Sequence, residues 1–150
     1  MKEVTLEAKL DSIPVLTDIV EEELAQADCP PKAMIQLSVA IDEIFSNIAS
    51  YAYADKERAV TQERAAGAEP AWGFATVRIE LLNEPRGIDL TFIDRGIPFD
   101  PLKREDPDIS APLGERQIGG LGIFMVKKTM SSMKYEYSDG RNILTIRKLF

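Results

Sequence analysis

The stretch MIQLSVAIDEIFSNIASYAY, residues Met34 to Tyr53, decides how this chain folds. Wound as a helix, it carries apolar residues around most of its circumference, which predicts a largely buried helix from about Pro31 to Tyr53. The apolar positions are Met34, Leu37, Val39, Ile41, Ile44, Phe45 and Ile48. Polar groups on such a helix, among them Glu43 and Asn47, need a reason to be there.

The segments before and after this helix predict its partners. EVTLEAKL, residues 3–10, alternates with period two and predicts a strand. DSIPVLTDIVEEELAQA then predicts an amphipathic helix with Asp11 or Ser12 as the N-cap. The expected apolar stripe of that helix is Val15, Ile19, Val20 and Leu24. Further along, FATVRIELLN and GIDLTFID predict two strands joined by a turn.

The C-terminal third completes the pattern. IFMVKKTMSSM predicts a helix directly after a glycine cluster, and KYEYSDGRNILTIRKLF predicts a hairpin with Asp139 and Gly140 at its turn. We expect a surface insertion at 54–74 and a lid at 95–118 within one domain of residues 1–150. The element order predicts an α+β fold: a two-layer sandwich whose mixed, mainly antiparallel sheet carries helices on one face.

Composition excludes several classes of function. The net charge of -7 gives no basic surface for nucleic acid or acidic membranes and favours a protein or small-molecule partner. The N-terminus lacks the apolar core of a signal peptide, and no run approaches the ~18 apolar residues of a membrane span. The absence of histidine excludes histidine phosphorylation and histidine ligation of metals within this chain. With one cysteine, Cys29, the chain suits a reducing compartment, so we expect a cytoplasmic protein.

A first candidate site lies in the long helix. Glu43 and Asn47 are four residues apart and lie on the same helical face, whereas Asp42 points elsewhere. The carboxamide oxygen can bind a hydrated cation, and the carboxylate can act as a base beside it. Taken alone, the pair also fits a polar stripe that reaches solvent.

Two further motifs follow. FIDRGIPFDP places Asp94 at a strand end, where it can accept a hydrogen bond from an exocyclic amine, and Gly96 lets the backbone approach a ligand. GERQIGGLGIFMV has Gly119, Gly120 and Gly122 opening a helix, where N–H groups and the helix dipole can bind an anion. A flexible loop that closes onto a helix would look similar to this last motif.

In this order and spacing, the three motifs closely resemble the N box and the two glycine boxes of the GHKL ATPase superfamily, named for gyrase, Hsp90, histidine kinases and MutL. Within it, DEIFSNIASYAY, DRGIPFDP, GGLGIFMVKKTM and YSDGRNILTIRKLF look most like the anti-sigma factor serine/threonine kinases of bacterial partner-switching systems. The resemblance runs from about Val4 to Leu149 and implies a histidine-kinase-like ATPase domain.

The resemblance implies a role for each matching residue, with ATP and Mg²⁺ as cofactors. Asn47 matches the magnesium-coordinating asparagine, and Glu43 matches the general base. Asp94 matches the aspartate that recognises the adenine amine, with Gly96 beside it. Arg116 stands where lid arginines reach the terminal phosphate. The matching phosphate-binding residues are Gly119, Gly120, Leu121 and Gly122.

Two functions remain open. The resemblance implies a homodimeric anti-sigma factor that binds Mg-ATP, sequesters a sigma factor and phosphorylates an anti-sigma antagonist. The alternative is a non-catalytic switch of the same fold, in which nucleotide orders the lid and the output is partner binding; Glu43 argues against it. Two features depart from the family: Tyr51 stands where a histidine is frequent, and the 54–74 connection is longer than usual.

Overall fold

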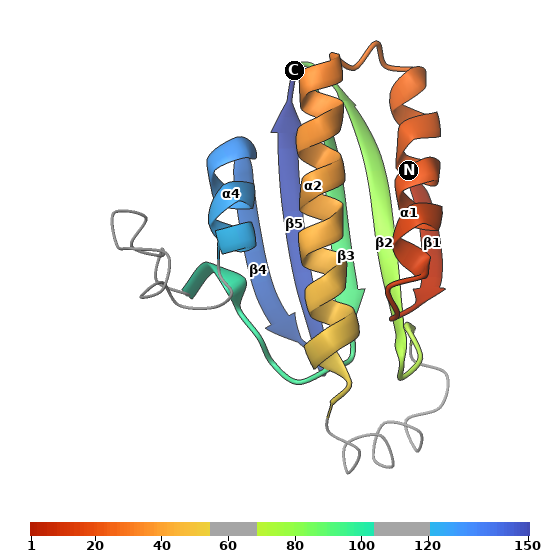
Figure 1. Ribbon diagram of the computed structural model, residues 1–150, viewed down its shortest axis with the longest axis vertical. Helices are drawn as coiled ribbons and strands as arrows, with labels where there is room; N and C mark the ends of the chain where they lie inside the picture. The colour runs from red at the N-terminus through yellow and green to blue at the C-terminus, as the bar shows by residue number, and fades with distance from the viewer. Residues whose placement is uncertain (55–68, 104–120) are drawn as a thin grey trace.

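The computed structural model describes residues 1–54, 69–103 and 121–150. Its helices and strands follow the order expected from the sequence (Figure 1). They are β1 (Lys2–Glu7), α1 (Ser12–Ala25), α2 (Pro31–Asn47), β2 (Phe74–Asn83), β3 (Arg86–Asp94), α4 (Leu121–Thr129), β4 (Ser132–Ser138) and β5 (Arg141–Leu149). Most of the expected insertion at 54–74 and of the expected lid at 95–118 lies outside the described residues.

The strands form a five-stranded sheet in the order β1-β2-β3-β5-β4. Every pairing in this sheet is antiparallel. The β2–β3 and β4–β5 hairpins each reverse the chain, and the two helices between β1 and β2 return it in the opposite direction. Because β4 lies outside β5, it forms no parallel pair with β3. The expected α+β sandwich is thus confirmed, with antiparallel pairing in place of the expected mixed sheet.

The helices α1, α2 and α4 lie on one face of the sheet, with α2 between the other two (Figure 1). α2 contacts both neighbours, which makes it the centre of the helical layer. Within the described ranges, no helix has the length and apolarity needed to cross a membrane.

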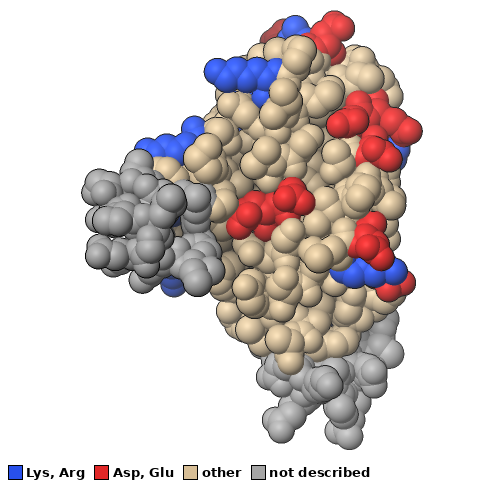
Figure 2. Space-filling view, in the orientation of Figure 1, with Lys and Arg blue, Asp and Glu red and all other residues tan. Residues whose placement is uncertain are grey.

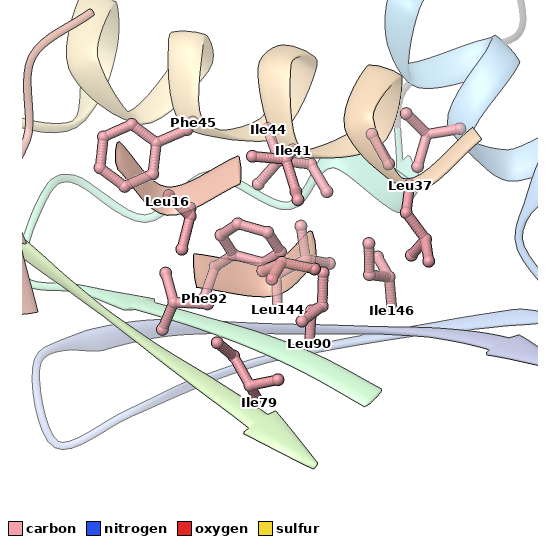
Figure 3. Packing of buried hydrophobic residues seen from close by; sticks show 14 of the residues in the cluster. Leu16, Leu37, Ile41, Ile44, Phe45, Ile79, Leu90, Phe92, Leu144 and Ile146 are labelled. Atoms are coloured by element: carbon pink, nitrogen blue, oxygen red, sulfur yellow. The ribbon is translucent and has the colours of Figure 1, made fainter. Parts of the chain in front are cut away.

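The hydrophobic core fills the space between the helices and the sheet (Figure 3). The side chains that meet there include Leu37, Ile41, Ile44 and Phe45 from α2 and Ile79, Leu90, Phe92, Leu144 and Ile146 from the strands. In β3, Leu90 and Phe92 are buried against the helices while Thr91 between them is only partly buried, as the period of two requires. Each fully buried side chain of this size contributes roughly 1.5–3 kcal/mol.

Two predicted core residues are exposed. Val15 of α1 is 48% exposed and Val39 of α2 is 50% exposed. The buried stripe of α1 instead runs through Ser12, Leu16, Val20 and Leu24, at a spacing of four residues. That stripe and the matching one in α2 set the rotation of each helix, and Val15 and Val39 lie outside them. Asp11 occupies the N-cap position of α1 without a capping hydrogen bond from its side chain.

Two predicted boundaries are confirmed. α2 continues into a π-helical turn at Ile48–Ala52, so the helical segment ends beside Tyr53, as expected. In the β4–β5 turn, Asp139 and Gly140 both have positive φ, 54° and 74°. A two-residue hairpin turn of this kind needs positive φ at both positions, which Asp and Gly tolerate well.

Candidate functional site

A cavity opens beside the C-terminal end of α2. The space between its walls, with the open solvent at its mouth included, is about 560 Å³. Its apolar walls include Ile44, Ile48, Phe92, Ile97, Ile123 and Leu144. The amide and carboxylate groups that reach it belong to Asn47, Asp94 and Asn142. The cavity is therefore a mainly apolar slot with a few polar groups.

Asp94, the last residue of β3, supplies the acidic group of this cavity. The residue is only 5% exposed. Its Oδ1 accepts hydrogen bonds from the Gly96 amide at 2.8 Å and from Asn142 Nδ2 at 2.9 Å. Burial raises the pKa of the Asp94 carboxyl group, and these two hydrogen bonds oppose that rise. Both donors use Oδ1, so neither of them occupies Oδ2.

Gly96 brings the loop after β3 against the π-helical turn that follows α2. The amide of Ile97 donates to the Ala52 carbonyl at 3.0 Å. A Cβ atom on Gly96 would overlap that same carbonyl and the Ala52 side chain. A side chain at this position would therefore push the loop away from the cavity.

Asn47 and Glu43 occupy different surroundings, although both belong to α2. Asn47 lines the same cavity as Asp94. The Glu43 carboxyl group instead lies against Gly122 in the first turn of α4, where a Cβ atom on Gly122 would overlap it. Figure 2 shows acidic side chains near the centre of the helix-covered face.

The predicted phosphate site falls only partly within the described residues. Arg116, Gly119 and Gly120 lie outside the described residues. Leu121 begins α4 and Gly122 is its second residue, so the helix starts within the glycine motif, two residues before the expected start at Ile123. Among the described residues, no cluster of three or more His, Cys, Asp or Glu could hold a metal ion.

Sequence reasoning missed two polar residues of the site, Asn142 and Tyr135. Both line the cavity, and the Tyr135 hydroxyl donates a hydrogen bond to Asn142 Oδ1. The sequence did contain a signal for Asn142. In the alternating pattern of β5, Asn142 lies on the same face as the core residues Leu144 and Ile146. A polar residue in such a series indicates either a buried hydrogen-bond network or a ligand.

The arrangement suits a flat heterocycle that carries an amine. Apolar walls can pack against the faces of a ring, and Asp94 can accept a hydrogen bond from an exocyclic N–H group. Because Asp94 is buried, a ligand without a donor at that point would leave the Oδ2 atom without a hydrogen bond, at a cost of roughly 1–3 kcal/mol.

Comparisons with known proteins relate this chain to a family, a kinase and a solved structure. The family described as "Histidine kinase-like ATPase domain" matches residues 6–148. The serine/threonine-protein kinase BtrW of Bordetella bronchiseptica is 26% identical over 110 residues, which cover 73% of this chain and 66% of that kinase, slightly under two thirds of its length. A chain in the crystal structure of the SiaB–SiaC complex from Pseudomonas aeruginosa matches with a TM-score of 0.52 at 12% identity, covering 100% of this chain and 90% of that one. At that identity the structural match shows the fold alone.

Proposed function

The chain belongs to the family of histidine kinase-like ATPase domains, and from that premise we propose that it is an anti-sigma regulatory factor with serine/threonine kinase activity. It binds Mg-ATP, sequesters a sigma factor and phosphorylates an anti-sigma antagonist. The observation that carries the nucleotide part is the buried Asp94 in a mainly apolar cavity. The similarity to a relative named as a serine/threonine-protein kinase supports the kinase part.

In this proposal the adenine ring lies in the cavity, with its exocyclic amine donating to Asp94. Gly96 would support adenine binding without touching the amine. It lets the loop after β3 pack on Ala52, and this loop closes one side of the cavity. Guanine presents a carbonyl oxygen where adenine presents the amine. A carboxylate cannot donate to that oxygen, so the site should reject GTP.

The phosphates and the metal ion would lie towards Asn47 and the start of α4. Asn47 would give one oxygen ligand to Mg²⁺, an ion that proteins hold with few side chains because phosphates and water complete its shell. The Mg²⁺ ion would neutralise negative charge on the phosphates. Arg116 would contact the terminal phosphate. The phosphate-binding segment would be Gly119, Gly120, Leu121 and Gly122, through main-chain N–H groups at the helix start.

For catalysis, we assign Glu43 as the general base. The hydroxyl oxygen of the acceptor Ser or Thr attacks the γ-phosphorus, the bond from that phosphorus to the β–γ bridging oxygen breaks, and ADP leaves. The hydroxyl proton passes to the Glu43 carboxylate. Such a transfer depends on positioning and on cationic groups more than on covalent help from the protein.

The proposal also includes the setting in which this activity would operate. The protein would be cytoplasmic, would regulate transcription through the sigma factor, and would act as a homodimer without contacting nucleic acid itself. Sedimentation of the purified protein tests the dimer. Copurification with candidate sigma factors and antagonists, with and without Mg-ATP, tests the partners.

One observation favours the alternative, a nucleotide-gated switch without catalysis. Glu43 does not line the cavity and instead packs against Gly122 at the start of α4. In a switch, nucleotide binding would act through this contact on the packing of α4 against α2. The protein would then bind its partner without transferring phosphate. The presence or absence of phosphate transfer separates the two functions.

Isothermal titration calorimetry with ATP and GTP, each with Mg²⁺, tests the nucleotide site directly. We expect ATP to bind at least about tenfold more tightly, the equivalent of ~1.4 kcal/mol. Asn47→Ala should weaken Mg-ATP more than metal-free ATP. Equal affinities for ATP and GTP would remove Asp94 from adenine recognition, and an unchanged ratio in Asn47→Ala would remove Asn47 from the metal.

A further inference from the structure

Asn142 of β5 occupies a position where the strand pattern favours an apolar residue. It is 6% exposed and shares its face of the sheet with the buried residues Leu144 and Ile146. In the sheet register it lies directly opposite Asp94. Burying a carboxamide is unfavourable unless its hydrogen bonds are made, and a leucine would fill a core position without that cost. The partners of Asn142 should therefore explain its presence.

Hydrogen bonds occupy both the donor and the acceptor ends of the Asn142 carboxamide. Nδ2 donates to Asp94 Oδ1 at 2.9 Å and to the Ile97 carbonyl at 2.8 Å. Oδ1 accepts from the Phe99 amide at 3.0 Å and from the Tyr135 hydroxyl. Because an ionised carboxylate only accepts and a backbone amide only donates, these partners fix which end of the carboxamide faces which group.

These bonds connect groups that all belong to the cavity. Asp94, Ile97, Phe99 and Tyr135 line it. Asn142 thus ties the acceptor carboxylate to the loop that forms part of the cavity wall. Without Asn142, the Gly96 amide would be the remaining described donor to Asp94, and one hydrogen bond would let the carboxylate rotate about its own Cβ–Cγ bond.

We propose that Asn142 is a positioning residue for adenine recognition, which holds the Asp94 carboxylate and the 97–99 wall in one fixed geometry. This inference rests on the proposed nucleotide binding and adds a residue that sets its specificity. Asn142 Nδ2 donates to Asp94 Oδ1 and to the Ile97 carbonyl. Asp94 Oδ2 is thereby left to accept from the amine of the ligand. Its effect should appear in the recognition of that amine rather than in binding of the triphosphate.

The test compares ATP with purine riboside triphosphate, which has the same ring and phosphates but lacks the exocyclic amine. Calorimetry with Mg²⁺ gives the ratio of the two affinities, in which contributions from the phosphates cancel. We expect wild type to prefer ATP by about tenfold or more. Asn142→Leu, close in volume but without hydrogen bonds, should bring the ratio near one. Asn142→Thr keeps one hydroxyl donor in a strand-favouring residue and should give an intermediate ratio.

A matched control separates positioning from loss of stability. Ile146→Val removes one methylene group from a buried position of the same strand that does not line the cavity, and it should leave the ratio unchanged. If Leu and Thr at position 142 both retain the wild-type ratio, the inference is overturned while the nucleotide site stands. If wild type binds neither nucleotide, the proposed function and the inference both fall. Should Asn142→Leu not fold, the Thr variant decides alone.

Discussion

The carboxylate of Asp94 is held in a place that disfavours its charge. Burial raises its pKa, and the hydrogen bonds from Asn142 and Gly96 only oppose that rise. A folded-state pKa above the unfolded value means that protonation favours folding. The contribution of Asp94 to stability is therefore fully present below the unfolded pKa of about 3.9 and is lost as pH rises through the folded pKa. The proposed function explains why so unfavourable a group is kept.

Asp94→Asn should separate stability from function. The new amide oxygen can still accept from Gly96 and Asn142, and no charge remains to be buried. We expect a higher melting temperature than wild type at about pH 7.5, with a gain that shrinks as pH falls towards about 4. Mg-ATP binding should be lost, because an amide NH₂ group now faces the adenine amine. Thermal melts across this pH range check the first point; a gain that does not vary with pH would contradict it.

Among the elements, the contact between α2 and α4 depends on Gly122. A Cβ atom there would overlap the Glu43 carboxyl group, so Gly122→Ala should push this flexible side chain away from α4. Because the Glu43 side chain can turn aside, the cost should be small, and the better helix propensity of alanine stabilises by up to ~1 kcal/mol. Chemical denaturation of Gly122→Ala, Glu43→Ala and the double variant forms a mutant cycle. Alanine at 122 should be tolerated once Glu43 is shortened; additive effects would mean that the two residues do not touch.

Tyr53 fastens three elements to one another at the base of the site. Its hydroxyl donates to the Phe74 carbonyl at the start of β2 and accepts from the Arg95 amide just after β3, at 2.8 Å. Tyr53→Phe leaves both groups without this partner, which should lower the free energy of unfolding by about 0.5–1.5 kcal/mol. Tyr51→Phe is the matched control, because Tyr51 is 60% exposed and its change should stay within about 0.5 kcal/mol. If Tyr53→Phe and Tyr51→Phe lower the free energy of unfolding equally, the hydrogen bonds of the Tyr53 hydroxyl do not contribute to stability.

Features of the fold that depend on residues close together in the sequence could be predicted, whereas those that depend on distant residues could not. Helix and strand positions were predictable because their periodicities are local, and the β4–β5 turn because Asp139 and Gly140 tolerate positive φ. Helix rotation was harder: Val15 and Val39 were expected in the core, but packing against the sheet selected other stripes. Antiparallel pairing throughout the sheet also depends on where β4 docks, which local pattern does not reveal.

The candidate site divides in the same way. Asp94, Gly96 and Asn47 lie in short motifs, and the cavity brings Asp94 and Asn47 to one place. Asn142 is far from Asp94 in the chain, and only the register of β5 on β3 sets them opposite each other. Tyr135 then reaches Asn142 from β4 across the next pair of strands. Such contacts depend on the assembled sheet, so a single sequence can flag Asn142 as unusual without naming its partners.

At the scale of the whole molecule, the cavity is one end of the hydrophobic core. Ile44, Phe92 and Leu144 belong to both. A ligand that binds the folded chain and not the unfolded one must stabilise all of it, by ~2.7 kcal/mol at a hundred times its dissociation constant. Mg-ATP should therefore raise the melting temperature of wild type but not of Asp94→Asn. A rise with GTP as large as with ATP would point to phosphate binding alone.

Whether the molecule is a kinase or a switch rests on Glu43. As general base, it accepts the proton of the acceptor hydroxyl, and a positioned base is typically worth ~10²–10⁴ in rate. Glu43→Gln keeps the size and reach of the side chain but removes its basicity. We therefore expect near-normal Mg-ATP affinity and sigma factor capture, with phosphate transfer slowed by roughly 10²–10⁴.

The measurement is transfer of labelled phosphate from ATP to the antagonist under single-turnover conditions, for wild type and Glu43→Gln side by side. Asp42→Asn is the matched control, since it removes a neighbouring charge on an exposed position of α2 and should not change the rate. If wild type and Glu43→Gln transfer phosphate equally fast, Glu43 is not the general base. If wild type binds Mg-ATP and partner but transfers no phosphate, the contact between Glu43 and Gly122 belongs to a switch, in which nucleotide acts on the helix layer and binding is the output.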